Sequence, residues 1–158
     1  LAAGLSLAEV SDGLKNFSNI KGRLNIKQGI KGATLIDDTY NANPDSMKAA
    51  IDVLAAMPAP RIFVMGDMGE LGEDEAAAMH AEVGAYARDK GIEAAYFVGD
   101  NSVEAAETFG AEGLWFADKD PLIQVLSHDL PERATVLVKG SRFMKMEEVV
   151  EALATTTA

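Results

Sequence analysis

Short apolar segments alternate with amphipathic segments along most of this chain, and that alternation limits the folds it can adopt. Five apolar segments are four or five residues long, and each precedes a stretch with apolar residues at helical spacing. Near-continuous apolar strands are typical of sheets buried on both faces, and strands that alternate with helices favour right-handed crossovers and parallel pairing. The segments are ATLI (33–36), RIFVM (61–65), AAYFV (94–98), GLWFA (113–117) and ATVLV (134–138).

A segment of a different kind precedes the first of these. Leu24, Ile26 and Ile30 lie at even spacing among polar residues, which predicts a half-buried strand. A two-residue link, 31–32, joins it to the next segment and permits an antiparallel pair but no parallel crossover. The prediction is an α/β fold with an open sheet of about six mostly parallel strands, one antiparallel at an edge, and helices on both faces.

Capping signals place the helices. Asn43 before Pro44 predicts a helix start, and Lys90-Gly91 predicts a helix end. The spacing of Ser6 and Glu9 is that of a capping box. Helices are expected near 6–17, 44–54, 79–87, 103–107, 121–126 and 146–153.

The composition limits the classes of binding partner and the cellular compartments that suit this chain. The 158 residues suit one domain, and the net charge of −11 disfavours a nucleic-acid partner. Neither a membrane-spanning apolar run nor a secretory leader is indicated. The absence of cysteine excludes a disulfide framework and fits a reducing compartment. Because the chain begins with Leu-Ala-Ala-Gly and lacks an initiator methionine, we expect a piece of a longer protein.

Polar residues gather directly after the apolar segments. In open parallel sheets, ligands bind beyond the carboxyl ends of the strands. The polar segments of this chain therefore fall where an α/β fold places its ligand-binding and catalytic groups. They are DDTYNAN (37–43), GDMGELG (66–72), GDN (99–101), ADKD (117–120) and KGSR (139–142).

Each segment allows a structural and a functional interpretation. Asp37 and Asp38 either close the strand with Asx turns or hold a pair of ribose hydroxyls. Asn43 begins a helix, yet with Tyr40 and Asn41 it also suits a flat heterocycle.

KGSR contains two cations, Lys139 and Arg142, and the hydroxyl of Ser141, just before a predicted helix. These groups suit the binding of a carboxylate or phosphate. The alternative is that they are surface cations at a helix start. GDMGELG lacks the glycine spacing of a nucleotide fingerprint, and its acids would repel an anion. It is therefore interpreted as a tight turn that could face another domain or a cationic group. His80 and His128 have no partner at ligand spacing, so neither a metal site nor a catalytic triad is predicted.

Four segments together resemble a known family, the Mur ligases, over their carboxyl-terminal domain. The resemblance extends over essentially the whole chain, with residues 21–158 as that domain and residues 1–20 as the end of the preceding domain or its linker. The segments are LIDDTYNANPDSMKAAIDVL (35–54), VMGDMGELG (64–72), HAEVG (80–84) and VLVKGSRFMKMEEVVEAL (136–153).

The resemblance implies a Rossmann-like domain of an ATP-dependent, cytoplasmic amide-bond ligase of peptidoglycan synthesis. In such an enzyme UDP-N-acetylmuramoyl-tripeptide is activated as an acyl phosphate, and D-alanyl-D-alanine attacks it. Arg23 matches the arginine that reaches toward the ATP phosphates, and Asp38 matches the acid that holds the ribose. By the same resemblance Tyr40, Asn41 and Asn43 face the nucleotide, and Lys139, Ser141 and Arg142 bind the incoming dipeptide.

The chain lacks other parts of that family's site. It has no G-x-x-x-x-G-K-[ST] sequence, so ATP and Mg²⁺ are expected to be held mainly by upstream domains, and the chain alone is expected to be inactive. We assign no catalytic residue to it. Two alternatives remain: a phosphoacceptor receiver domain, in which Asp37, Asp38, Asp67 and Lys139 would share one pocket, and a non-catalytic interaction module.

Overall fold

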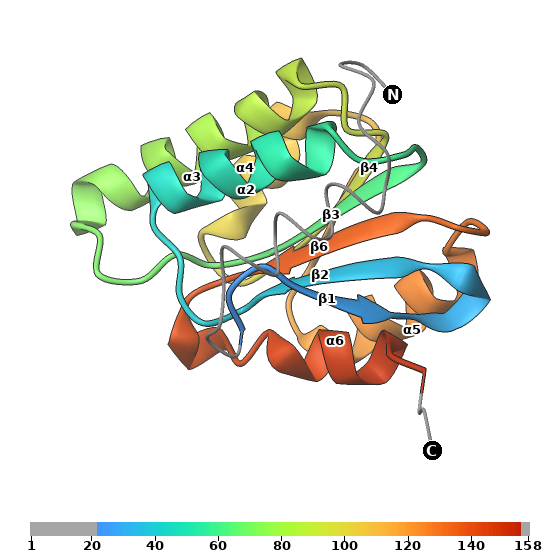
Figure 1. Ribbon diagram of the computed structural model, residues 1–158. Coiled ribbons are helices and arrows are strands. Elements are labelled where there is room, and N and C mark those ends of the chain that lie inside the picture. The colour runs from blue at the N-terminus through green and yellow to red at the C-terminus, as the bar shows by residue number, and fades with distance from the viewer. Residues whose placement is uncertain (1–21, 156–158) are drawn as a thin grey trace.

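Six strands form one sheet in the computed structural model, which describes residues 22–155 (Figure 1). Their order is β1-β2-β6-β3-β4-β5; β1 pairs with β2 antiparallel, and the other neighbours pair parallel. The strands are β1 (Asn25–Gln28), β2 (Thr34–Asp38), β3 (Arg61–Gly66), β4 (Ala94–Val98), β5 (Gly113–Phe116) and β6 (Thr135–Lys139). The helices are α2 (Pro44–Ala55), α3 (Glu73–Asp89), α4 (Ser102–Phe109), α5 (Lys119–Asp129) and α6 (Glu147–Leu153).

The predicted fold class is confirmed, including the antiparallel strand at the edge of the sheet. Two of the three residues expected in the first strand lie outside it. Leu24 precedes β1 and has a left-handed φ of 49°. Ile30 begins a 3-10 turn, Ile30–Gly32, in which Lys31 has φ 55° and Gly32 has φ 72°. This left-handed pair reverses the chain, and the Gly29 N–H donates to the Ala33 carbonyl at 2.8 Å to close the reversal. The helix expected at 6–17 lies outside the described residues.

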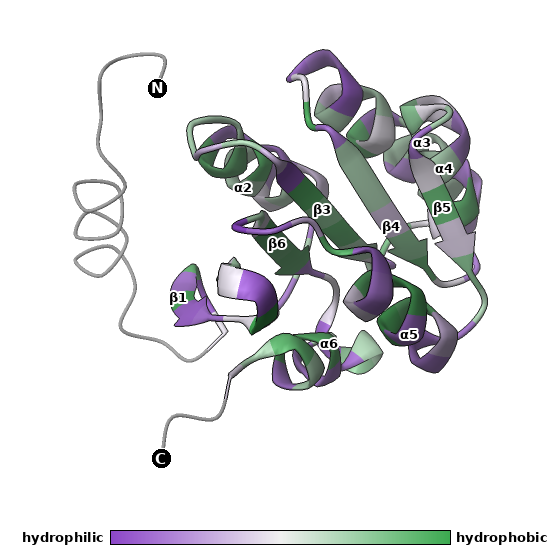
Figure 2. Cartoon of the chain, turned by 90° about the vertical axis from the view of Figure 1, so that its right-hand side faces the viewer, coloured by the Kyte–Doolittle hydropathy of each residue, from purple (hydrophilic) through white to green (hydrophobic). Residues whose placement is uncertain are grey.

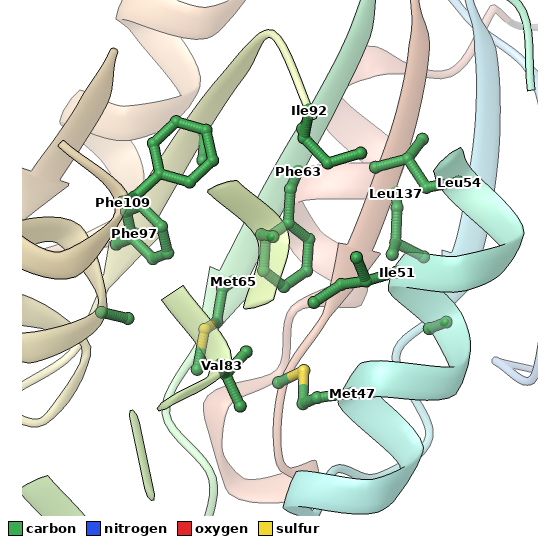
Figure 3. Packing of buried hydrophobic residues seen from close by; sticks show 14 of the residues in the cluster. Met47, Ile51, Leu54, Phe63, Met65, Val83, Ile92, Phe97, Phe109 and Leu137 are labelled. Carbon is green, nitrogen blue, oxygen red and sulfur yellow. The ribbon is translucent and has the colours of Figure 1, made fainter. Parts of the chain in front are cut away.

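The sheet separates two apolar layers. Helices α2, α3 and α4 cover one face, and α5 and α6 cover the other (Figure 1). Figure 2 shows the central strands as strongly hydrophobic segments between these layers, as expected for a sheet buried on both faces. In Figure 3, side chains of α2 point toward those of β3 and β6. The labelled examples are Met47, Ile51 and Leu54 from α2, Phe63 and Met65 from β3, and Leu137 from β6.

The start of α2 follows from its sequence. The Asn43 side chain accepts a hydrogen bond from the Ser46 N–H at 2.8 Å, and the Ser46 hydroxyl accepts one from the Asn43 N–H at 3.0 Å. Pro44 occupies the first helical position, where a missing N–H costs nothing. The structural interpretation of Asn43 is therefore confirmed, and its cap fixes the end of the loop that follows β2.

No helix between residues 22 and 155 is both long and apolar enough to cross a membrane.

Helices α3 and α4 touch at a glycine, which leads to a first prediction. A Cβ at Gly84 would lie 2.1 Å from the Ala105 carbonyl oxygen and 2.4 Å from Thr108 Oγ1. Gly84→Ala should therefore lower the free energy of unfolding by about 2 kcal/mol, although alanine favours helix, because the helices must move apart. Urea unfolding measures this.

The control is Gly72→Ala at the exposed start of α3, where no atom lies within 4 Å of the added methyl group. It should cost less than about 1 kcal/mol, because Gly72 supplies no side-chain cap that alanine would remove. Equal losses in the two variants would contradict the close contact between α3 and α4.

Candidate functional site

The segment after β2 begins with an acid that has a structural role. Asp37 is 1% exposed, and its carboxylate accepts hydrogen bonds from Lys27 Nζ at 2.8 Å and Thr39 Oγ1 at 2.6 Å. The Thr39 N–H lies 3.3 Å from the same carboxylate, as in an Asx turn. Asp37 thus closes β2 and ties it to β1, which is the structural interpretation raised by its position in the sequence.

Asp38 and Lys139 form a buried ion pair. They are register partners on β2 and β6, and Lys139 Nζ lies 2.9 Å from the Asp38 carboxylate. The two side chains are 10% and 4% exposed. Lys139 also donates to the Asn41 carbonyl at 2.9 Å, and the Leu24 N–H lies 3.3 Å from Asp38. Residues that the sequence assigns to two different ligands therefore contact each other and join three segments of the chain.

Tyr40 and Arg23 lie together at the surface beyond this pair. Tyr40 is 42% exposed, and the Arg23 guanidinium carbon lies 4.4 Å from the centroid of the Tyr40 ring. A stacked guanidinium keeps its N–H groups at the edge of the plane, where they can bind an anion. The prediction that Arg23 and Tyr40 share one site is thus compatible with their packing.

The KGSR segment approaches the end of β3 closely. A Cβ on Gly140 would lie 2.6 Å from the Met146 side chain and 3.1 Å from the Gly66 Cα, so this crossing requires glycine. Ser141 is 3% exposed; its hydroxyl accepts the Gly69 N–H, and its own N–H donates to the Asp67 carbonyl at 2.9 Å. The Ser141 side chain therefore links the two loops that follow β3 and β6.

Arg142 is the exposed member of this segment. It begins a 3-10 turn, Arg142–Met144, so the predicted position just before a helix is modified: α6 itself begins at Glu147. Its guanidinium donates two hydrogen bonds to the Glu147 carboxylate, at 3.1 and 2.8 Å. This pairing raises the pKa of Arg142. Burial disfavours the charged form of Glu147, but the hydrogen bonds from Arg142 and the backbone outweigh it, and the pKa of Glu147 is lowered.

Two pockets meet at Arg142. The first, which we call the Tyr40 pocket, has a volume of about 210 Å³; the second, the Phe143 pocket, has a volume of about 380 Å³. Arg142 lines both, while Glu147 lines the Tyr40 pocket. Phe143, which lines the Phe143 pocket, is 64% exposed. The Tyr40 pocket is lined by Lys27, Asp37, Thr39 and Tyr40 among others, and the Phe143 pocket by Asn41, Asn43, Gly69, Glu70, Leu71 and Ser141 among others.

Five of the eight predicted residues therefore converge from two loops, whereas Arg23, Asp38 and Lys139 line neither of these pockets. Tyr40 lines one pocket, and Asn41 and Asn43 line the other, so the loop after β2 borders both. Ser141 and Arg142 contribute from the loop after β6, which lies beside β2 in the sheet. The strand order explains this convergence, because β2 and β6 end at the same edge.

The acidic turn after β3 has a structural role at its first acid. The Asp67 carboxylate accepts hydrogen bonds from the Asn101 N–H at 3.0 Å, the Ser102 N–H at 2.8 Å and the Ser102 hydroxyl at 2.7 Å. It thereby caps the start of α4. Since this carboxylate is engaged with α4 while Asp38 pairs with Lys139, the acids do not form the shared pocket that a receiver domain requires. Within residues 22–155, no group of three or more acidic or histidine side chains could hold a metal ion.

Two residues at this site were not predicted. Glu147, in the first turn of α6, pairs with Arg142, and His80 is completely buried beneath the turn after β3. The five-residue separation of Arg142 and Glu147 across a predicted helix start is a signal that could have suggested their pairing. For His80, the partner is a backbone N–H, which leaves no side-chain pattern in the sequence.

Comparison with known proteins gives a consistent family. The family model described as Mur ligase, glutamate ligase domain, matches residues 22–142. The UDP-N-acetylmuramoyl-tripeptide–D-alanyl-D-alanine ligase of Escherichia coli (strain K12) is 44% identical over 155 residues, which cover 97% of this chain and 34% of that protein. The Haemophilus influenzae enzyme of the same name is 42% identical over 156 residues, covering 95% of this chain and 34% of its own.

Solved structures agree. A crystal structure of MurF from Acinetobacter baumannii superposes with a TM-score of 0.75 at 34% identity, covering 95% of this chain and 33% of that one. MurF ligase from Thermotoga maritima in complex with ADP gives a TM-score of 0.75 at 26% identity, covering 85% and 31%. The chain therefore spans about a third of the length of the curated relatives it matches.

Proposed function

The chain belongs to the Mur ligase family, and from that premise we propose that it acts as the carboxyl-terminal domain of an ATP-dependent ligase of cytoplasmic peptidoglycan synthesis. The ligase joins D-alanyl-D-alanine to UDP-N-acetylmuramoyl-tripeptide. Residues 1–20 form the end of the preceding domain or the linker to it, and the upstream domains supply the triphosphate site, the Mg²⁺ ligands and the UDP-binding region. The relatives of that name, three times as long as the matched region, support this division.

The observation that carries the proposal is the meeting of two pockets at Arg142. A ligase that joins a nucleotide-activated acid to an amine needs two neighbouring ligand sites. The Tyr40 pocket binds the nucleotide, and Arg23 lies next to it, stacked on the Tyr40 ring. The Phe143 pocket binds the dipeptide. An arginine with a planar pair of donors suits the dipeptide carboxylate, which Arg142 would bind in place of Glu147.

The polar groups of this chain fit ATP to differing degrees. The Arg23 guanidinium presents its edge to a phosphate oxygen. The Asp38 carboxylate has about four acceptor positions, of which Lys139 and the Leu24 N–H use two, so a ribose hydroxyl can share it. Lys139 then supports dipeptide binding indirectly, because it holds Asp38 and the Asn41 carbonyl in place. Ser141 and Arg142 line the Phe143 pocket, where the dipeptide would bind.

The chemistry explains why such a domain would close over its partners. Activation of the tripeptide carboxylate produces an acyl phosphate, which water destroys, so closure excludes water while it brings in the amine. Fixing the dipeptide by its carboxylate replaces a bimolecular encounter by an oriented one. Since this chain supplies binding and orientation, we expect it to have no ligase activity by itself.

Titration of this chain by two-dimensional NMR tests the proposal. D-alanyl-D-alanine should shift the amide signals of Ser141, Arg142 and Phe143, and ATP should shift those of Arg23, Asp38 and Tyr40, both weakly because half of each site is absent.

The matched control ligand is D-alanyl-D-alanine amide, which lacks the terminal carboxylate and should leave Arg142 unchanged. If neither ATP nor the dipeptide shifts any of these signals, the interaction-module alternative is favoured over the ligase.

A further inference from the structure

His80 is a buried titratable side chain that the proposed chemistry does not use. It lies on α3 with 0% of its surface exposed. Its Nδ1 lies 2.7 Å from the Ala76 carbonyl oxygen, and its Nε2 lies 2.9 Å from the Met68 backbone nitrogen. Because a carbonyl can only accept and a backbone N–H can only donate, the ring must carry its proton on Nδ1 and accept at Nε2.

The acceptor at Nε2 holds the turn that follows β3. Met68 lies in this turn, and Glu70 in the same turn has a left-handed φ of 60°. The nearest carboxylate, Asp67, lies 3.9 Å from Nε2 and is engaged with the start of α4. A buried N–H without an acceptor costs free energy, so the hydrogen bond to the imidazole fixes the position of the Met68 backbone.

The position of the Met68 backbone in turn affects the Phe143 pocket. The next residue, Gly69, donates its N–H to the Ser141 hydroxyl, and the Ser141 N–H donates to the Asp67 carbonyl at 2.9 Å. Gly69, Ser141 and Arg142 all line the Phe143 pocket. A Cβ on Gly69 would lie 2.9 Å from the Phe143 ring, so this backbone also supports the ring.

We propose that His80 is a positioning residue for the Phe143 pocket: its unprotonated Nε2 fixes the Met68 N–H, and so sets the Gly69–Ser141 contact that shapes the pocket around Arg142. The assignment of the dipeptide to this pocket rests on the proposed function, whereas the link from His80 to Ser141 does not. Neither a metal nor a proton transfer is involved.

Two amide substitutions separate the two ends of the ring. The asparagine of His80→Asn places its amide nitrogen near Nδ1 and can keep the bond to Ala76, but it leaves the Met68 N–H without an acceptor. The longer glutamine of His80→Gln places its amide oxygen near Nε2 and can keep the bond to Met68. The two variants therefore differ in the contact that the proposal depends on.

The experiment compares the dissociation constant of D-alanyl-D-alanine for this chain and for both variants by NMR titration. His80→Asn should weaken binding about tenfold, because it leaves the buried Met68 N–H unpaired beside the pocket, and should shift the amide signals of Gly69 and Ser141. His80→Gln should stay within about twofold of the wild type, because it restores the acceptor. In the wild type, the imidazole ¹⁵N signals should report the Nδ1–H form.

The outcomes distinguish this inference from the proposed function. If the dipeptide leaves Ser141 and Arg142 unshifted in the wild type, while His80→Asn still moves Gly69 and Ser141, the pocket assignment fails and the positioning role stands. Equal affinities in the two variants, or unmoved Gly69 and Ser141 signals in His80→Asn, would overturn the positioning role. If His80→Asn does not fold, the wild-type ring still decides, because an Nε2–H form would exclude the bond to Met68.

Discussion

Lys139→Met should lower the free energy of unfolding by about 3 kcal/mol, because it leaves the Asp38 carboxylate buried without its cation. Lys139 Nζ lies 2.9 Å from that carboxylate, and both side chains are at most 10% exposed. The same substitution removes the hydrogen bond to the Asn41 carbonyl, which fixes the loop after β2. Urea unfolding at neutral pH, followed by circular dichroism, measures the loss.

Two controls show whether burial causes the effect. Lys48→Met breaks a comparable pair with Glu82, at 2.6 Å but on the surface, and should leave stability unchanged within the precision of the measurement. The double variant Asp38→Asn with Lys139→Met carries no unpaired charge and should lose about 2 kcal/mol less than the sum of the single losses. A Lys139→Met variant that unfolds at the wild-type urea concentration would show that water reaches Asp38 freely.

This pair changes how binding experiments on the site have to be designed. From the sequence, Asp38→Ala is expected to weaken ATP binding and leave the fold intact. With Lys139 at 2.9 Å, the same substitution strands a buried ammonium group and destabilises the domain. Asp38→Asn keeps an acceptor for the Leu24 N–H and is the better probe of a ribose contact. The nucleotide affinity then has to be compared at a temperature where each variant is folded.

The sequence was sufficient to predict the layers of the fold. The short apolar segments at 61–65, 94–98 and 134–138, each followed by a helical pattern, predicted strands buried on both faces, and each is confirmed within one residue. The two-residue link at 31–32 correctly indicated the antiparallel edge. These features are local, which is why a single sequence reveals them.

The pairing of side chains across the sheet could not be predicted from the sequence. Asp38 meets Lys139 because β6, last in the chain, lies between β2 and β3, and neither strand carries a local signal of that order. Neighbouring acids differ for the same reason: Asp37 is satisfied by Lys27 on β1, and Asp38 by β6. His80 was missed because its partner, the Met68 N–H, is a backbone group that any residue would provide.

In the full-length ligase that we propose, Arg142→Ala should raise the KM for D-alanyl-D-alanine roughly 10²-fold, with a smaller change in kcat. The arginine is proposed to hold the dipeptide carboxylate through two parallel hydrogen bonds, and such binding is the same in the ground state and the transition state. Removing it also leaves the Glu147 carboxylate facing the ligand, because Glu147 occupies the guanidinium in this structure at 2.8 Å. Steady-state kinetics with each substrate varied in turn measures both constants.

The matched variants test charge, geometry and position separately. Arg142→Lys keeps the charge but loses the planar pair of donors, so its KM for the dipeptide should lie between those of the wild type and Arg142→Ala. Arg88→Ala removes a surface arginine that pairs with Asp89 at 3.0 Å near the end of α3, and it should leave both KM values unchanged. An Arg142→Ala effect confined to the KM for ATP would place the guanidinium on the nucleotide side. In that case the Tyr40 pocket, which Arg142 also lines, would be its site of action, and the dipeptide carboxylate would require a different cation.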